Sequence, residues 1–92
     1  MKDLPLFSIT IADGEDWTDA YERRFAAYYE ALFAGEEEEY VRLRDVVAQW
    51  LLHCSASPDL AEGKEPYQQF ECTFKSSAHL FKAYAVFRPK AN

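Results

Sequence analysis

Hydrophobic and polar residues alternate strictly along residues 7–12, FSITIA. Phe7, Ile9 and Ile11 would point to one side of an extended chain, and the smaller residues between them to the other. This period of two, with β-branched side chains, predicts a strand with one buried face. The acidic turn DGED that follows predicts the start of a helix, because carboxylates cap free N–H groups and suit the positive end of the helix dipole.

After that turn the apolar residues recur every three or four positions, which is typical of amphipathic helices. The first stripe holds Trp17, Tyr21, Phe25, Tyr28 and Leu32, with Ala26, Tyr29 and Phe33 in an adjacent stripe, and the second holds Tyr40, Leu43, Val47, Trp50 and Cys54. Gly35 stands between them, where a helix commonly stops. One continuous helix over residues 16–54 is the alternative, but its length and the internal glycine disfavour it. We therefore expect a helical hairpin.

Alternation returns after a loop-like stretch at residues 55–66. Every second residue from Phe70 to Phe74 is apolar or a cysteine, which predicts another half-buried strand. The sequence KSSAH predicts a turn, and alternation over residues 81–88 predicts the second arm of a β-hairpin. Residues 76–88 can also be interpreted as a short helix capped by Ser76.

The order of elements is β-α-α-β-β, which predicts an α+β fold in a single domain spanning residues 1–92. We expect a three-stranded antiparallel sheet with the helical hairpin packed on one face. The expected core comprises Phe7, Ile9, Ile11, Phe70, Phe74, Phe81 and Phe87 from the strands, and Trp17, Phe25 and Trp50 from the helices. The opposite face would carry Tyr84 and Val86, and an open, partly apolar face of this kind predicts a homodimer.

The net charge of −6 is distributed unevenly along the chain. Residues 1–46 hold 12 acids and 5 bases, whereas residues 47–92 hold 4 acids and 5 bases. Because an acidic protein is repelled by nucleic acid at long range, we do not expect general DNA or RNA binding. A basic protein partner, or association between the oppositely charged halves of two molecules, suits this distribution better.

Four consecutive glutamates precede the second helical stripe: Glu36, Glu37, Glu38 and Glu39. They would occupy the first helical turn, where unpaired N–H groups and the helix dipole favour negative charge. Glu38 also lies four residues before Arg42, a spacing that suits an ion pair along a helix. Local helix physics thus accounts for this run of acids without a ligand.

Candidate metal ligands and nucleophiles are few. The chain has two cysteines and two histidines, at His53, Cys54, Cys72 and His79, but their spacing matches no metal motif. Both thiols fall on predicted core faces, where they behave as small hydrophobes. We therefore expect no metal, no cofactor and no catalytic residue. Asp3 and Pro5 interrupt any signal peptide, and no apolar run could span a membrane, so we expect a cytoplasmic location with reduced cysteines.

The C-terminal stretch carries a basic, partly aromatic strip made of Lys75, His79, Lys82, Tyr84, Arg88 and Lys90. Nucleic acid could contact such a strip, but lysines also keep an exposed edge strand soluble, and we favour this second interpretation. The predicted order of elements is similar to that of the RelE-type ribosome-dependent toxins. That similarity implies RNA cleavage by the C-terminal strands, and it lies in the order of elements alone.

The sequence favours a non-enzymatic interaction module of the inhibitor, immunity or accessory type, acting by surface complementarity. The expected partner-binding residues are Glu30, Glu36, Glu37, Glu38, Glu39, Tyr84 and Val86. One alternative is a small-molecule-binding or enzymatic domain with an aromatic pocket, because Phe, Tyr and Trp make up 16% of the chain. Another is a RelE-like RNA-cleaving toxin that uses the basic hairpin.

Overall fold

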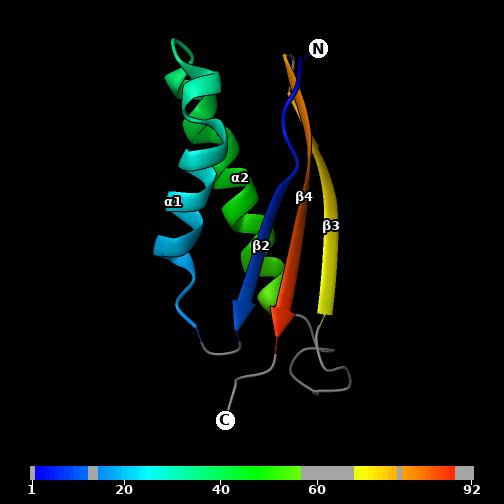
Figure 1. The fold of residues 1–92 in the computed structure, drawn as a ribbon. Coiled ribbons are helices and arrows are strands. Elements are labelled where there is room, and N and C mark those ends of the chain that lie inside the picture. Colours follow the sequence, from blue (N-terminus) through cyan, green and yellow to red (C-terminus); the bar gives the residue numbers. More distant parts are fainter. Residues whose placement is uncertain (1, 13–14, 57–67, 77, 89–92) are drawn as a thin grey trace.

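In a computed structural model, which describes residues 2–12, 15–56, 68–76 and 78–88, two helices cover one face of a β-sheet (Figure 1). The strands are β1 (Lys2–Asp3), β2 (Phe7–Ala12), β3 (Gln68–Lys75) and β4 (His79–Arg88). The helices are α1 (Thr18–Tyr29) and α2 (Glu37–Ser55), with a short 3-10 helix, η1 (Ala31–Phe33), between them. The expected α+β class and the β-α-α-β-β order are confirmed.

The sheet is mixed, so the expectation of a purely antiparallel sheet was wrong. β4 lies in the middle, with β3 antiparallel on one side and with β1 and β2 parallel on the other. The reason is visible in Figure 1, because each successive long element reverses the direction of the chain. β2 and β4 consequently point the same way, and β2 pairs with β4 rather than with β3.

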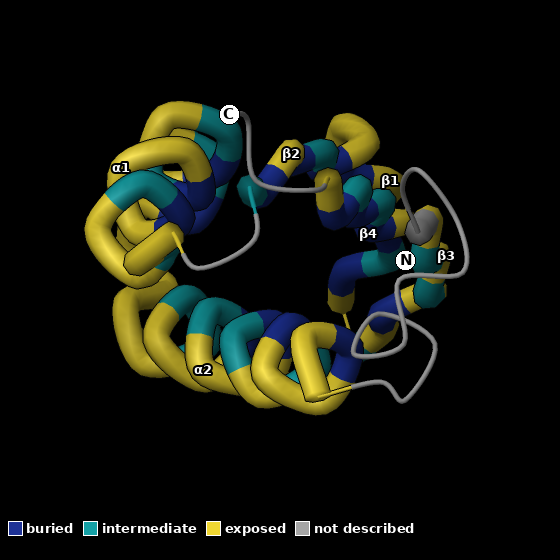
Figure 2. Tube along the Cα trace, turned by 90° about the horizontal axis from the view of Figure 1, so that it is seen from below, coloured by how far each residue is buried: buried dark blue, intermediate teal, exposed yellow. Residues whose placement is uncertain are grey.

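The helices pack on the sheet face that carries the odd-numbered residues of β2 and β4, and the buried residues line the space between the two layers (Figure 2). The strands contribute Phe7, Ile9, Ile11, Phe74, Phe81, Ala83, Ala85 and Phe87, and the helices contribute Tyr21, Phe25, Tyr29, Leu43, Val47, Leu51 and Cys54. Trp17, Trp50 and Phe70 were also expected in the core, but they are only partly buried. The predicted faces of β2 and β4 are therefore correct, whereas each helix is rotated slightly from its predicted orientation.

Phe25 lies at the centre of an aromatic core and is fully buried. Its ring centroid is 4.8 Å from that of Tyr29, 5.6 Å from that of Tyr21 and 5.8 Å from that of Phe7. Tilted and edge-to-face pairs of this kind stabilise a core beyond the area that they bury. These four rings pack against one another, so they do not line an open aromatic pocket.

Two buried tyrosine hydroxyls connect α1 to its neighbours. The hydroxyl of Tyr21 donates to the carbonyl oxygen of Arg44 on α2 at 2.5 Å. The hydroxyl of Tyr29 donates to the carbonyl oxygen of Pro5, between β1 and β2, at 2.7 Å. Burial raises the pKa of both phenols well above their usual range, because the charged phenolate would lose its hydration.

Gly35 separates η1 from α2. Its φ is +84°, in the left-handed region that only glycine adopts at little cost. The next residue, Glu36, donates its backbone N–H to the carbonyl oxygen of Phe33 at 2.7 Å, which closes the turn. The alternative of one continuous helix over residues 16–54 is therefore wrong.

The turn between β3 and β4 is held by Ser76. Its hydroxyl oxygen accepts hydrogen bonds from the backbone N–H groups of Ala78, at 3.3 Å, and His79, at 3.1 Å. Because β4 begins at His79, the alternative of a short helix over residues 76–88 is wrong. The loop expected at residues 55–66 lies outside the described residues from residue 57 onward.

Candidate functional site

An open groove of about 650 Å³ lies where α1, η1 and α2 meet at the surface of the helical hairpin. Phe33, Tyr40 and Ala26 line it with buried or half-buried apolar surface. Three exposed glutamates also line it: Glu22 and Glu30 from α1 and its end, and Glu37 from the first turn of α2. We call this surface the acidic groove.

Negative charge exceeds positive charge in the acidic groove. Arg44 is the one basic residue among those that line it. Its guanidinium lies 5.9 Å from the centroid of the Tyr40 ring, a cation–π arrangement, and 3.8 Å from a carboxylate oxygen of Asp45. Among the described residues, Glu22 and Glu30 form no ion pair. Both carboxylate side chains are exposed.

The four consecutive glutamates point in different directions. The predicted placement in the first turn of α2 is confirmed for Glu37, Glu38 and Glu39, whereas Glu36 precedes the helix. Glu37 reaches the acidic groove, and its Oε1 accepts a hydrogen bond from the backbone N–H of Gly35 at 3.3 Å. All four also border a smaller hollow at the end of the hairpin, so groove and end form one acidic surface.

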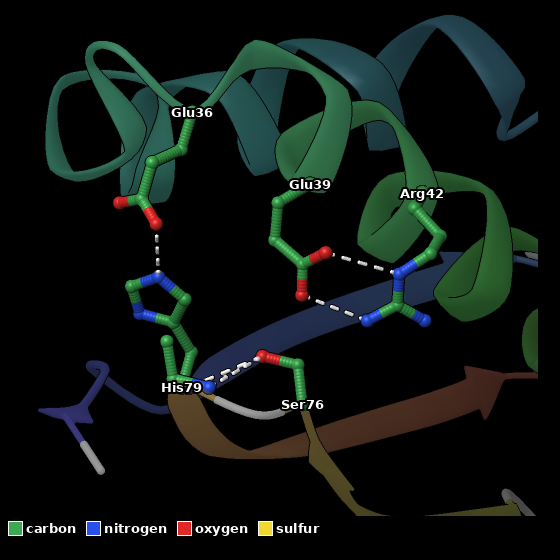
Figure 3. Close-up of polar contacts among 6 residues, drawn as sticks. Glu36, Glu39, Arg42, Ser76 and His79 are labelled. Carbon is green, nitrogen blue, oxygen red and sulfur yellow. Dashed lines mark hydrogen bonds and ion pairs between the residues drawn. The ribbon is translucent and has the colours of Figure 1, made fainter.

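Glu39, rather than Glu38, pairs with Arg42. The guanidinium donates from Nη2 to Glu39 Oε1 at 2.8 Å and from Nε to Oε2 at 3.1 Å (Figure 3). The predicted ion pair from Glu38 was therefore wrong, because a separation of three residues on a helix also brings side chains together. The Arg42 guanidinium, and secondarily the Ser76 hydroxyl, lower the pKa of Glu39 to about 2.

Glu36 extends toward the sheet and meets His79. The Nε2 atom of His79 lies 3.4 Å from Glu36 Oε1 (Figure 3). The ring centroid of His79 lies 4.4 Å from that of Phe33. His79 is only 3% exposed, so its inclusion in a basic surface strip was wrong. Because it shares the parity of Phe81 along β4, its side chain lies on the helix-covered face. This contact attaches the start of α2 to the start of β4.

The other expected binding residues, Tyr84 and Val86, lie on a different surface. They belong to the face of β4 that the helices do not cover, and both are half-buried. Tyr84 donates its hydroxyl hydrogen to Gln69 Oε1 at 2.5 Å, and Lys82 pairs with Glu71 at 3.1 Å. The structure thus brings Glu30 together with Glu37 in the acidic groove, places Glu36, Glu38 and Glu39 around the adjoining hollow, and separates all of them from Tyr84 and Val86.

The candidate metal ligands and nucleophiles are His53, Cys54, Cys72 and His79. Within the described ranges, no three His, Cys, Asp or Glu side chains are arranged to hold a metal ion. Burial raises the pKa of Cys54 to about 11, so its thiol stays protonated near neutral pH and is a poor nucleophile. His53 is exposed, and His79 is engaged by Glu36.

Glu39→Gln is expected to destabilise the protein near neutral pH and to have no effect in strong acid. The folded state holds the Glu39 pKa at about 2, below its ordinary value of 4.5, so the carboxylate stabilises the fold above pH 4.5. That contribution is lost as the pH falls from 4.5 to about 2. Urea unfolding at several pH values measures the difference between variant and wild type.

Glu38→Gln is the matched control for this experiment, because it removes the same charge from the same helical turn. Glu38 is exposed and has no ion pair among the described residues. Both variants lose the same interaction with the helix dipole, so we expect Glu38→Gln to lose less stability near neutral pH than Glu39→Gln, which also loses the ion pair. Equal effects of the two substitutions would contradict a specific role for the Glu39–Arg42 pair.

No protein-family model matches the chain, and neither curated proteins nor solved structures give a significant match. The similarity to RelE-type toxins is therefore confined to the order of elements. Across the described residues, no helix combines the length and the apolar character needed to cross a bilayer.

Proposed function

We propose that the protein is a non-enzymatic interaction module, of the inhibitor, immunity or accessory type, that binds a basic surface of another protein through the acidic groove. The observation that carries this proposal is the combination of exposed Glu22, Glu30 and Glu37 with an apolar lining and a single guanidinium. The adjacent glutamates at the end of the hairpin extend the same negative surface.

A lysine or arginine side chain of the partner matches the chemistry of the acidic groove. Its aliphatic stem would pack on Tyr40 and on Val41, which is 42% exposed. Its charged head would reach the carboxylates of Glu30 and Glu37. In such an interface the buried apolar contacts supply most of the affinity, and the charges accelerate association and fix orientation.

Affinity capture from the native host, with mass-spectrometric identification, tests this proposal. The baits are the wild type, Glu30→Gln/Glu37→Gln, and the control Asp3→Asn/Asp19→Asn. Both variants lose two charges, but Asp3 and Asp19 are exposed residues outside the groove. We expect one or more basic proteins to be retained by wild type and control, lost from the groove variant, and released by salt. Equal retention by all three baits would overturn the proposal.

We also propose a cytoplasmic location. Cys54 and Cys72 are both free thiols in the structure. Unpaired cysteines are usual in reducing compartments, whereas exported proteins of this size commonly use disulfides.

A further inference from the structure

The two edges of the sheet are protected to different degrees. On the β2 side, Pro5 interrupts the chain between β1 and β2. Side chains of α1 also cover carbonyl groups there: Arg24 Nη1 donates to the Ser8 oxygen at 3.4 Å, and Tyr29 donates to the Pro5 oxygen. Proline and covering side chains are the usual means of preventing a sheet edge from pairing with another chain.

The β3 edge lacks such protection in the part of the chain that the structure describes. Ser76 donates its backbone N–H to the carbonyl oxygen of His79 at 2.8 Å, so even-numbered residues of β3 exchange hydrogen bonds with β4. The backbone groups of the odd-numbered residues therefore point outward: Gln69, Glu71, Thr73 and Lys75. The one described contact to these groups is a weak one, from Cys72 Sγ to the Thr73 oxygen at 3.8 Å.

We propose that a second copy of this chain pairs with this edge, β3 against β3 in antiparallel orientation, with Thr73 opposite the partner's Thr73. The two sheets would then form one continuous sheet about a two-fold axis. In this register Glu71, which also pairs with Lys82 of its own chain, lies opposite the partner's Lys75, and the symmetry repeats that pair on the other side of the axis. Opposite charges and paired threonines directly across a strand pair both stabilise it.

Charge selects this register over its neighbours. Register changes in steps of two residues, because the same side chains must stay on the same face. Sliding the partner by two residues in one direction places Cys72 opposite the partner's Cys72 and separates the charged residues. A further step places Glu71 opposite the partner's Glu71, which is repulsive. The register centred on Thr73 is the one that pairs Glu71 with Lys75.

Two further properties of the chain suit this dimer. Residues 47–92, which include β3, carry a net charge of +1. The excess negative charge of the protein lies in residues 1–46 and therefore not on the strand that pairs in this dimer. Along β3, Phe70 and Cys72 remain partly exposed on the helix-covered side. A second copy would cover both, and burying apolar surface is favourable. The interaction is independent of the acidic groove.

Light scattering after size exclusion is the first test. We expect the wild type to have twice the chain mass of 10.7 kDa, and Lys75→Glu to have the mass of one chain, because it would place like charges across the interface. Val86→Lys, on the uncovered sheet face, is the control and should remain dimeric. A monomeric wild type, or a dimer dissociated by Val86→Lys and not by Lys75→Glu, would overturn the proposal. Circular dichroism establishes that each variant is folded.

Disulfide trapping tests the register. Opposed residues in a hydrogen-bonded antiparallel pair have Cα atoms about 5.5 Å apart, within the range that a disulfide spans. In a Cys72→Ser background, Thr73→Cys is therefore expected to give a covalent dimer under mild oxidation. Gln69→Cys in the same background should not. Covalent dimer formation by the wild type through Cys72, without efficient trapping at position 73, would show that the register is wrong.

Discussion

Replacing Phe25 with alanine is expected to reduce the free energy of unfolding by about 3–5 kcal/mol. Its ring is fully buried and contacts aromatic residues from β2, α1, α2 and β4, so no single neighbour can move to fill the cavity. A loss of that size is a large share of the stability of a typical small domain, about 5–15 kcal/mol. Urea unfolding at fixed protein concentration measures it.

Two further substitutions separate cavity formation from general loss of apolar surface. Phe25→Leu retains much of the volume and should cost less than the alanine variant. Leu52→Ala removes an apolar side chain that is 51% exposed, and it should change stability by no more than about 0.5 kcal/mol. A similar cost for Phe25→Ala and Leu52→Ala would mean that the aromatic core does not organise the fold.

The protein is expected to lose stability steeply above pH 10. Tyr21 and Tyr29 have raised pKa values when folded, because burial disfavours the phenolate, whereas in the unfolded chain they titrate near 10.0. Above that pH the unfolded state releases protons that the folded state retains, so unfolding becomes more favourable as pH rises. Each tyrosine contributes about 1.4 kcal/mol per pH unit. Their stabilising effect is therefore complete below pH 10 and declines above it.

The variant Tyr21→Phe/Tyr29→Phe tests the origin of this alkaline unfolding. It should be less stable near neutral pH, since two hydrogen bonds are lost, each worth about 1 kcal/mol. Its stability should nevertheless depend less on pH above 10 than that of the wild type. Tyr84→Phe, which removes a hydroxyl from the uncovered sheet face, should keep the steep dependence. An unchanged slope in the double variant would assign alkaline unfolding to other groups.

The order of the strands along the chain, and the face that each strand buries, could be predicted from the sequence because alternation determines which side chains share a face. The same rule places His79 on the buried face with Phe81, because the two residues are separated by one position. The prediction instead grouped His79 with the basic residues of the surface. Alternation does not specify which strands are neighbours. The pairing of β2 with β4 depends on how the helical hairpin returns the chain to the sheet, and no local pattern encodes it.

The helix rotations were harder to predict. An apolar stripe on a helix is broad, so neighbouring rows are both acceptable until the sheet selects one. In α1 the buried row includes Tyr29, from the stripe adjacent to the main one, and in α2 it includes Leu51 in place of the expected Trp50. The selection follows from packing, since large indole rings are seldom completely enclosed in a small core.

The acidic end of the hairpin was predicted from the run of glutamates, but the groove beside it was not. Glu22 lines the groove but was not among the predicted partner-binding residues. It lies about two helical turns before Glu30 and therefore on the same side of α1. That spacing was a usable signal in the sequence. The meeting of this row with Glu37 could not be predicted, because it depends on the left-handed turn at Gly35 and on η1.

The central position of β4 determines when the fold can be completed during synthesis. β4 follows all other elements of the described chain, and yet β1, β2 and β3 each pair with it. A ribosome releases the chain from its N-terminus, so β2 has no strand partner until Arg88 has left the exit tunnel. Folding of the sheet is therefore expected to wait for the release of β4 and to be governed by long-range contacts. A translation product ending before His79 would retain β1, β2 and β3 but none of the hydrogen bonds that join them into a sheet.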